Sequence, residues 1–96
     1  MRTYKYNFLI GSNNKTHKRE IKKAINTLND LKVMGFNVNN NIGLWNNQRE
    51  NSFNIEIISN RENPFNDFLA RQLKKQLEIN LKQFLVLTIK QEIEVL

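Results

Sequence analysis

The sequence predicts a two-layer α+β sandwich of the ferredoxin-like type, with strands and helices in the order β-α-β-β-α-β. Apolar residues alternate with polar ones, the period of a half-buried strand, in residues 4–10, 36–38 and 53–57. Two intervening segments carry apolar residues at helical spacing, in residues 21–28 and 65–77. A last apolar run over residues 84–89 completes the order, and no linker or repeat divides the chain, which indicates one domain over residues 1–96.

The first half of the chain contains one strand, one helix and the start of a second strand. A strand is expected near Thr3 to Ile10, followed by a turn at residues 11–14. Thr16 has the side chain of a good N-cap, so the helix is expected to start there and to end near Asn29 and Asp30. Gly35 then leads into the second strand.

In the second half, Gly43 is expected to mark a bulge, ahead of a turn at residues 46–48. The third strand is expected over residues 51–59. Asn63 and Pro64 have the residue types of an N-cap and a first helical position, so a helix is expected from there to Asn80. A fourth strand follows over residues 84–90, with a continuation towards residue 95 left open.

The crossover rules for such units predict a four-stranded antiparallel sheet in the order 4-1-3-2, with both helices on one face. Tyr4, Tyr6, Phe8 and Phe53 share the parity of the helix-covered face, so they are expected in the core rather than on an RNA-stacking surface. The alternative is another α+β sandwich that has the same elements in a different order.

Several classes of function are poorly supported. The chain has no cysteine and a single histidine, His17, beside two cations, so neither a metal set nor a nucleophile–base pair is expected. The turn at residues 11–16 precedes a helix but lacks the second glycine of a Walker phosphate loop, although a small anion could still be held there. We therefore expect a non-enzymatic protein without a cofactor, located in the bacterial cytoplasm.

Positive charge is concentrated at the start of the first predicted helix. Five cations and one acid, Glu20, lie between residues 15 and 23, in a chain of net charge +6: Lys15, Lys18, Arg19, Lys22 and Lys23. Cations there oppose the helix dipole, and such a local conflict is typical of a functional surface. We expect these residues, with Trp45 and Arg49 of the hairpin, to contact a partner. A solvated lysine-rich face is the alternative interpretation.

A second surface is expected on the sheet face that the helices leave uncovered. Leu9 and Ile58 have the parity of that face, and the fourth strand is apolar on both of its sides. One of those sides, either Phe84 and Val86 or Leu85 and Leu87, must join the uncovered face, and we assign Phe84 and Val86 to the interface. Large exposed apolar patches mark interfaces, so a two-fold dimer that packs sheet against sheet is expected.

Abundant Asn, Lys and Ile, which have A/T-rich codons, indicate the genome of a low-GC bacterium or of its phages or plasmids. The chain resembles small phage-encoded α+β proteins, some of which act as anti-CRISPR or other counter-defence inhibitors. The resemblance rests on the element order and on three stretches: residues 11–16, residues 35–38, and Gly43-Leu44-Trp45 followed by Glu50-Asn51-Ser52. It implies a binding protein that blocks or sequesters a host component.

The partner expected from this resemblance and from the charge is a host protein or ribonucleoprotein complex that handles nucleic acid. Two alternatives stay open. The first is a module that binds the DNA or RNA backbone directly through the basic helix. The second is a homo-oligomer that sequesters a small nucleotide.

Overall fold

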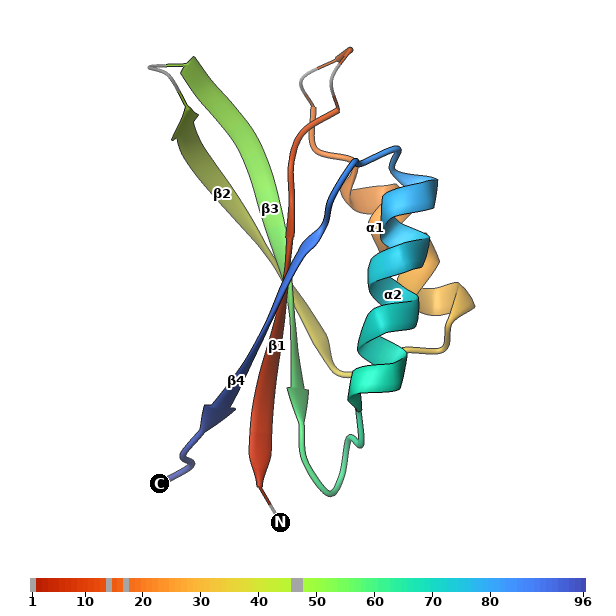
Figure 1. The fold of residues 1–96 in the computed structure, drawn as a ribbon, viewed down its shortest axis with the longest axis vertical. Coiled ribbons are helices and arrows are strands. Elements are labelled where there is room, and N and C mark those ends of the chain that lie inside the picture. Colours follow the sequence, from red (N-terminus) through yellow and green to blue (C-terminus); the bar gives the residue numbers. More distant parts are fainter. Residues whose placement is uncertain (1, 14, 17, 46–47) are drawn as a thin grey trace.

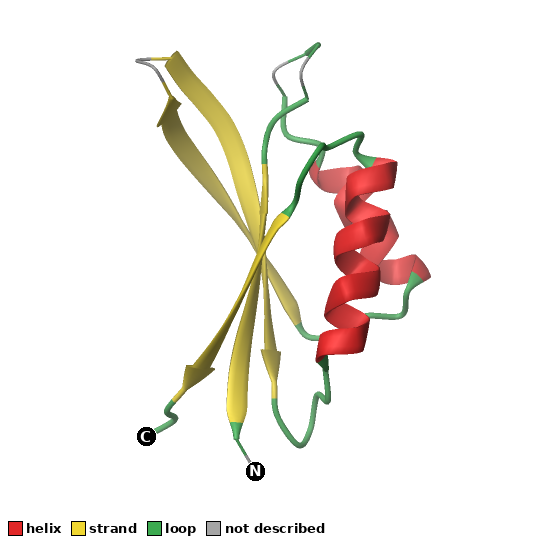
Figure 2. Cartoon of the chain, in the orientation of Figure 1, coloured by secondary structure: helices red, strands yellow, loops and turns green. Residues whose placement is uncertain are grey.

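The computed structural model describes residues 2–13, 15–16, 18–45 and 48–96, and of residues 41–45 and 48–50 it describes the backbone alone. The described residues form six elements in the predicted order: β1 (Thr3–Ile10), α1 (Ile21–Asp30), β2 (Phe36–Trp45), β3 (Gln48–Ser59), α2 (Asp67–Asn80) and β4 (Leu87–Ile93). Four antiparallel strands lie in the order β2-β3-β1-β4 in this part of the chain, and both helices cover one face of the sheet (Figures 1 and 2). The fold is ferredoxin-like, and the predicted strand order is confirmed.

The core lies between the central strands β1 and β3 and the two helices. Alternate residues of these strands are buried: Tyr6, Phe8, Ile10, Phe53, Ile55 and Ile57. They meet the apolar stripes of the helices, in which Leu28, Leu73 and Leu77 are fully buried. The prediction that the aromatic side chains of β1 and β3 face the helices is therefore confirmed. Their rings pack in the core, where nucleic-acid bases cannot stack on them.

The helix α2 begins later than the sequence predicts. Its N-cap is Asn66, whose side-chain oxygen accepts a hydrogen bond from the backbone N–H of Leu69 at 2.9 Å. Asn63, the predicted cap, instead donates its amide hydrogens to the carbonyl oxygens of Met34 at 3.2 Å and Ile58 at 3.0 Å. Because the Asn63 side chain joins two separate segments, it is not available to cap a helix.

Both helices end near the predicted residues, and they end in the same way. After α1, the N–H of Val33 donates to the carbonyl of Leu28 at 2.9 Å, and Lys32 adopts a left-handed φ of 57°. After α2, the N–H of Gln83 reaches the carbonyl of Glu78, also at 2.9 Å, and Lys82 has a φ of 52°. This is the Schellman motif, with a lysine at the position where glycine is usual.

The hairpin of β2 and β3 is longer and more regular than predicted. Its register is unbroken from Phe36 opposite Ile57 to Trp45 opposite Gln48, so Gly43 does not mark a bulge and Gln48 belongs to β3. The other residues of the predicted turn, 46 and 47, lie outside the described residues. Since β1 pairs with β3 only from Phe53 onward, residues 41–45 and 48–52 form a two-stranded arm beyond the rest of the sheet (Figure 1).

The last strand corrects the predicted dimer surface. It begins at Leu87, because the N–H of Val86 donates instead to the Glu78 carboxylate at 2.9 Å. Val86 is fully buried in the core, and Phe84 is fully exposed ahead of the strand, so neither lies on the uncovered sheet face.

The other two predicted interface residues do lie on that face. Leu9 pairs with Leu87 and Ile58 pairs with Lys5, and both Leu9 and Ile58 are half-buried. Polar groups separate them, since Lys5 forms an ion pair with Glu56 at 3.7 Å, and the amide of Asn54 donates to that of Asn7 at 3.2 Å. The uncovered face is therefore not the continuous apolar patch that was expected.

Candidate anion-binding surface

The segment between β1 and α1 is a structured loop. The side-chain oxygen of Asn13 accepts hydrogen bonds from the N–H groups of Lys15 at 2.8 Å and Thr16 at 3.0 Å. The N–H of Asn13 donates to the carbonyl of Lys18 at 2.9 Å, which closes the loop. The prediction that Thr16 caps the helix is wrong, because these local bonds replace the first helical turn and α1 begins at Ile21.

The predicted basic face is consequently split between two elements. Lys15, Lys18 and Arg19 lie in the loop, and Lys22 and Lys23 lie in the first turn of α1. The loop still keeps these cations at one end of the molecule. His17 lies outside the described residues.

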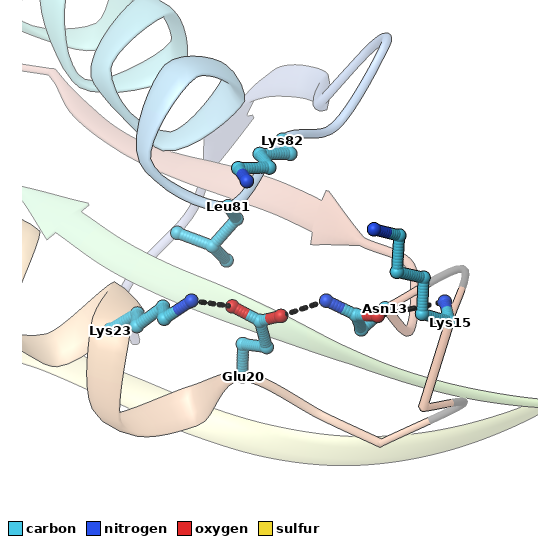
Figure 3. Close-up of a pocket in the computed structure, with 6 residues that line it drawn as sticks. All are labelled: Asn13, Lys15, Glu20, Lys23, Leu81 and Lys82. Atoms are coloured by element: carbon cyan, nitrogen blue, oxygen red, sulfur yellow. Dashed lines mark hydrogen bonds and ion pairs between the residues drawn. The ribbon is translucent and has the colours of Figure 1, made fainter.

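A cavity of about 200 Å³ opens where this loop meets the end of α2. Six residues line it: Asn13, Lys15, Glu20, Lys23, Leu81 and Lys82 (Figure 3). Three of them are lysines, and one, Glu20, is a carboxylate. Figure 3 shows Glu20 between Lys23 and Asn13, with Leu81 and Lys82 across the cavity from them. The arrangement has a surplus of positive charge and a polar floor, which suits an anionic group.

Lys82 was not singled out from the sequence, although the topology provides a signal for it. In the β-α-β-β-α-β sandwich the two helices pack against each other and run antiparallel, so the start of α1 lies beside the end of α2 (Figure 1). Lys82 follows α2 directly and is exposed. A lysine at that place adds to a charge cluster at residues 15–23 that is distant from it in sequence. We call Lys15, Lys18, Arg19, Lys22, Lys23 and Lys82 the basic surface.

Glu20 holds the floor of the cavity together. One of its oxygens lies 3.0 Å from the Lys23 ammonium, and the other accepts a hydrogen bond from the Asn13 amide. The hydrogen bond from Lys23, then that from Asn13, keep the pKa of this carboxylate below its ordinary value. Glu20 therefore stays ionised at neutral pH, and it offsets only one of the surrounding charges.

The start of α1 adds to the positive field. Its N-cap residue, Glu20, makes no side-chain capping hydrogen bond, and the first turn contains no acidic residue. The first N–H groups of a helix have no partner within the helix, and the helix dipole places partial positive charge there. Lys22 and Lys23 lie in this same turn, so both backbone and side chains favour an anion at this end of the molecule.

Arg19 links the loop to the hairpin arm. Its Nε–H donates to the carbonyl of Ser52 at 2.9 Å, where the arm leaves the sheet. Trp45 and Arg49, which were expected to contact a partner, lie farther along this arm in the backbone register, and the structure does not describe their side chains. This hydrogen bond connects the basic surface to the start of the arm.

The carboxylates in this region make the stability of the fold depend on pH. Hydrogen bonds from Lys74, and then from the N–H of Val86, lower the pKa of Glu78, as those from Lys23 and Asn13 do for Glu20. A lowered pKa contributes stability that is complete above the unfolded value, near 4.5, and is lost as the pH falls through the folded value. The free energy of unfolding should therefore decrease from about pH 5 downward.

Urea unfolding at several pH values tests this prediction. Glu20→Gln should be less stable than the wild type at pH 7, and the difference in the free energy of unfolding should narrow as the pH falls through the lowered folded-state pKa of Glu20, below which this group is protonated in both states. Glu20→Gln with Glu78→Gln should show the weakest pH dependence. An acid-induced loss as steep in the double variant as in the wild type would contradict the assignment.

Among the described residues, no group of three His, Cys, Asp or Glu side chains is placed to hold a metal ion. No helix formed by the described part of the chain is long and apolar enough to cross a membrane.

Comparison with known proteins gives structural matches. No family model matches the sequence, and no curated protein matches it significantly. GlnK of B. subtilis, solved as a complex with ATP, superposes with a TM-score of 0.57 at 16% identity, over 96% of this chain and 82% of that one. CutA1 from Oryza sativa superposes with a TM-score of 0.56 at 12% identity, over 99% and 83%. At such identities the likeness establishes the shared fold alone.

Proposed function

We propose that the chain is a non-enzymatic binding protein whose basic surface holds an anionic partner. The observation that supports this most strongly is the convergence of three lysines from three segments, Lys15, Lys23 and Lys82, at the uncapped start of α1, with Glu20 as the acid among them. A solvated face of α1 alone would not account for the lysine that follows α2. The proposal deepens the interpretation from the sequence, because Lys82 belongs to the same surface.

The partner that fits this surface is the phosphate backbone of a nucleic acid. Lys15, Lys18, Lys22 and Lys82 are all exposed, so their ammonium groups can approach phosphates without leaving a buried environment. Cations spread over one end of a molecule neutralise several phosphates at once, and the release of counterions then drives binding. With the resemblance to counter-defence proteins, this supports a host nucleic-acid-handling complex as the target, and free DNA or RNA as the alternative.

A second candidate is a small anion such as a nucleotide, and the cavity favours it. Its volume of about 200 Å³ accommodates a phosphate group but not a whole nucleoside triphosphate. Lys15 and Lys82 would contact that phosphate, and the rest of the ligand would extend outside. The ATP complex of the similarly folded GlnK gives this candidate a further, weaker support.

Fluorescence anisotropy with a labelled duplex of arbitrary sequence tests backbone binding. Affinity should fall steeply with salt, and Lys18→Glu with Lys22→Glu should weaken binding at least about tenfold and lower the salt slope by about 2. Both side chains are exposed, so stability should change by no more than about 0.5 kcal/mol.

A matched control carries the same charge change elsewhere. Lys32→Glu with Lys75→Glu also reverses two exposed lysines, at the far end of α1 and on α2, away from the cavity. This control should bind the duplex nearly as the wild type does. Equal losses in both variants would show that net charge alone governs binding, and the basic surface would then have no specific role. Competition by ATP at constant ionic strength identifies the small-anion candidate.

A further inference from the structure

The strand β4 has an open edge. It is the last strand in the order β2-β3-β1-β4, and among the described residues only β1 pairs with it. Proteins usually protect such an edge with charged side chains, proline or bulges, because unpaired N–H and C=O groups invite another strand. The β4 sequence, LTIKQEI, contains no proline, and its pairing with β1 is unbroken. Its two charges, Lys90 and Glu92, have opposite signs, so a second antiparallel copy of the strand can pair with them.

The two sides of β4 differ in character. Leu87 and Ile89 lie opposite Leu9 and Asn7 of β1 on the face that the helices leave uncovered, and they remain 50% and 44% exposed. Lys90 and Glu92 alternate with them and point to the helix side. Val95, two residues after the strand, continues the apolar parity and is 73% exposed. This edge therefore has one apolar face and one charged face.

We propose that β4 pairs antiparallel with β4 of a second copy of this chain, about a two-fold axis at Gln91. This register sets Ile89 opposite Ile93 and Leu87 opposite Val95 on the uncovered face. On the helix side it sets Lys90 opposite Glu92. Each pair occurs twice because of the symmetry, so the apolar residues of the uncovered face meet one another and Lys90 meets Glu92, while Glu94 lies opposite Thr88.

The alternative registers lack this complementarity. Pairing centred on Lys90 sets two lysines directly opposite each other, and pairing centred on Glu92 does the same with two glutamates, which is destabilising. Registers displaced by one residue set the apolar side of one copy against the charged side of the other. Among the registers centred on Lys90, Gln91 and Glu92, the strand therefore favours the one centred on Gln91.

Inside one protomer, the same two charges have other partners. Lys90 lies 3.0 Å from an Asp67 oxygen and 4.4 Å from the centre of the Tyr4 ring, and Glu92 lies 3.5 Å from Arg2. The Lys90 and Glu92 side chains are still 41% and 55% exposed, so a second copy can reach them. These intramolecular pairs provide an internal control. Exchanging the charges of Lys90 and Glu92 breaks both intramolecular ion pairs, whereas the predicted ion pair between positions 90 and 92 of the two protomers is kept.

Edge pairing also fits the position of the basic surface. The strand β4 runs away from the end of the molecule that carries residues 15–23, and its C-terminal end lies at the opposite end of the sheet (Figure 1). The dimer would form one continuous eight-stranded sheet, with two basic surfaces free to act. This inference is independent of the proposed function, since the pairing does not use any residue of the basic surface.

Sedimentation velocity of the full chain at micromolar concentrations tests the proposal. The wild type should sediment as a dimer, and Lys90→Glu or Glu92→Lys alone should weaken dimerisation about tenfold. The swap, Lys90→Glu with Glu92→Lys, should restore dimerisation to within about threefold of the wild type. The swap places like charges next to each other inside the protomer, at Asp67 and at Arg2. Restored dimerisation therefore comes from contacts between protomers.

Ile58→Lys separates edge pairing from packing between sheet faces. Ile58 lies on β3, two strands from the β4 edge, so this variant should remain a dimer if the edges pair. A wild type that is monomeric at about 100 μM overturns the proposal, and so does a trimer. Loss of the dimer in Ile58→Lys, or failure of the charge swap to restore it, overturns it as well.

Discussion

Replacing Phe8 by alanine should lower the free energy of unfolding by about 3–5 kcal/mol. Phe8 is fully buried at the middle of β1, and its ring meets the Phe65 ring edge-to-face with centroids 6.4 Å apart. Because β1 pairs with strands on both sides, the surrounding structure cannot collapse into the space that the ring leaves. Urea unfolding followed by circular dichroism measures the loss.

Phe68→Ala is the matched control for this change. Phe68 lies on α2 and is 66% exposed, so the same truncation there should change stability by no more than about 0.5 kcal/mol. Similar losses at both positions would contradict the placement of Phe8 in the core.

The second large effect is expected at Gly35, where alanine should cost about 2–4 kcal/mol. Gly35 has a φ of 67°, a left-handed conformation that is unfavourable for residues with a side chain. A Cβ atom there would lie 2.7 Å from the Asn63 amide nitrogen. That amide bonds the carbonyl oxygens of Met34 and Ile58, so moving it breaks the connection between the start of β2 and the end of β3.

A double-mutant cycle separates the two causes. In an Asn63→Ala background the clash is absent, and Gly35→Ala should then cost only the backbone strain, about 1–2 kcal/mol. If Gly35→Ala lowers the free energy of unfolding equally in both backgrounds, the contact between residue 35 and Asn63 does not contribute to stability.

The arrangement of the elements was predictable because it depends on periodicity and on a small set of topological rules. The alternation around Phe8 and Phe53 identified both the strands and the faces they bury, and the crossover rule then fixed the strand order. Helix starts were less predictable, because Thr16, Asn63 and Asn66 are all suitable caps by residue type. Tertiary bonds decide among them, as the contacts of the Asn63 side chain show.

The candidate site was predictable only in part. The cluster at residues 15–23 is visible as charge along the chain, but the sequence does not show that a loop carries its first part. Lys82 joins the cluster through the packing of the two helices, which no local pattern reports. The predicted start of the last strand, at residue 84, was wrong for a similar reason. The N–H of Val86 donates to the Glu78 carboxylate and not to the sheet, and β4 begins at Leu87.

The pairing of β1 with β4 has a consequence for how the protein reaches its native state. This ladder joins Thr3 to Ile93 and Leu9 to Leu87. Almost the whole chain must therefore be synthesised before β1 can pair with β4 as well as with β3. Contacts between residues so distant in sequence slow folding. A nascent chain on the ribosome can form the β2–β3 hairpin early, but β1 keeps one unpaired edge until β4 emerges. During that interval, the unpaired edge of β1 is open to wrong pairing.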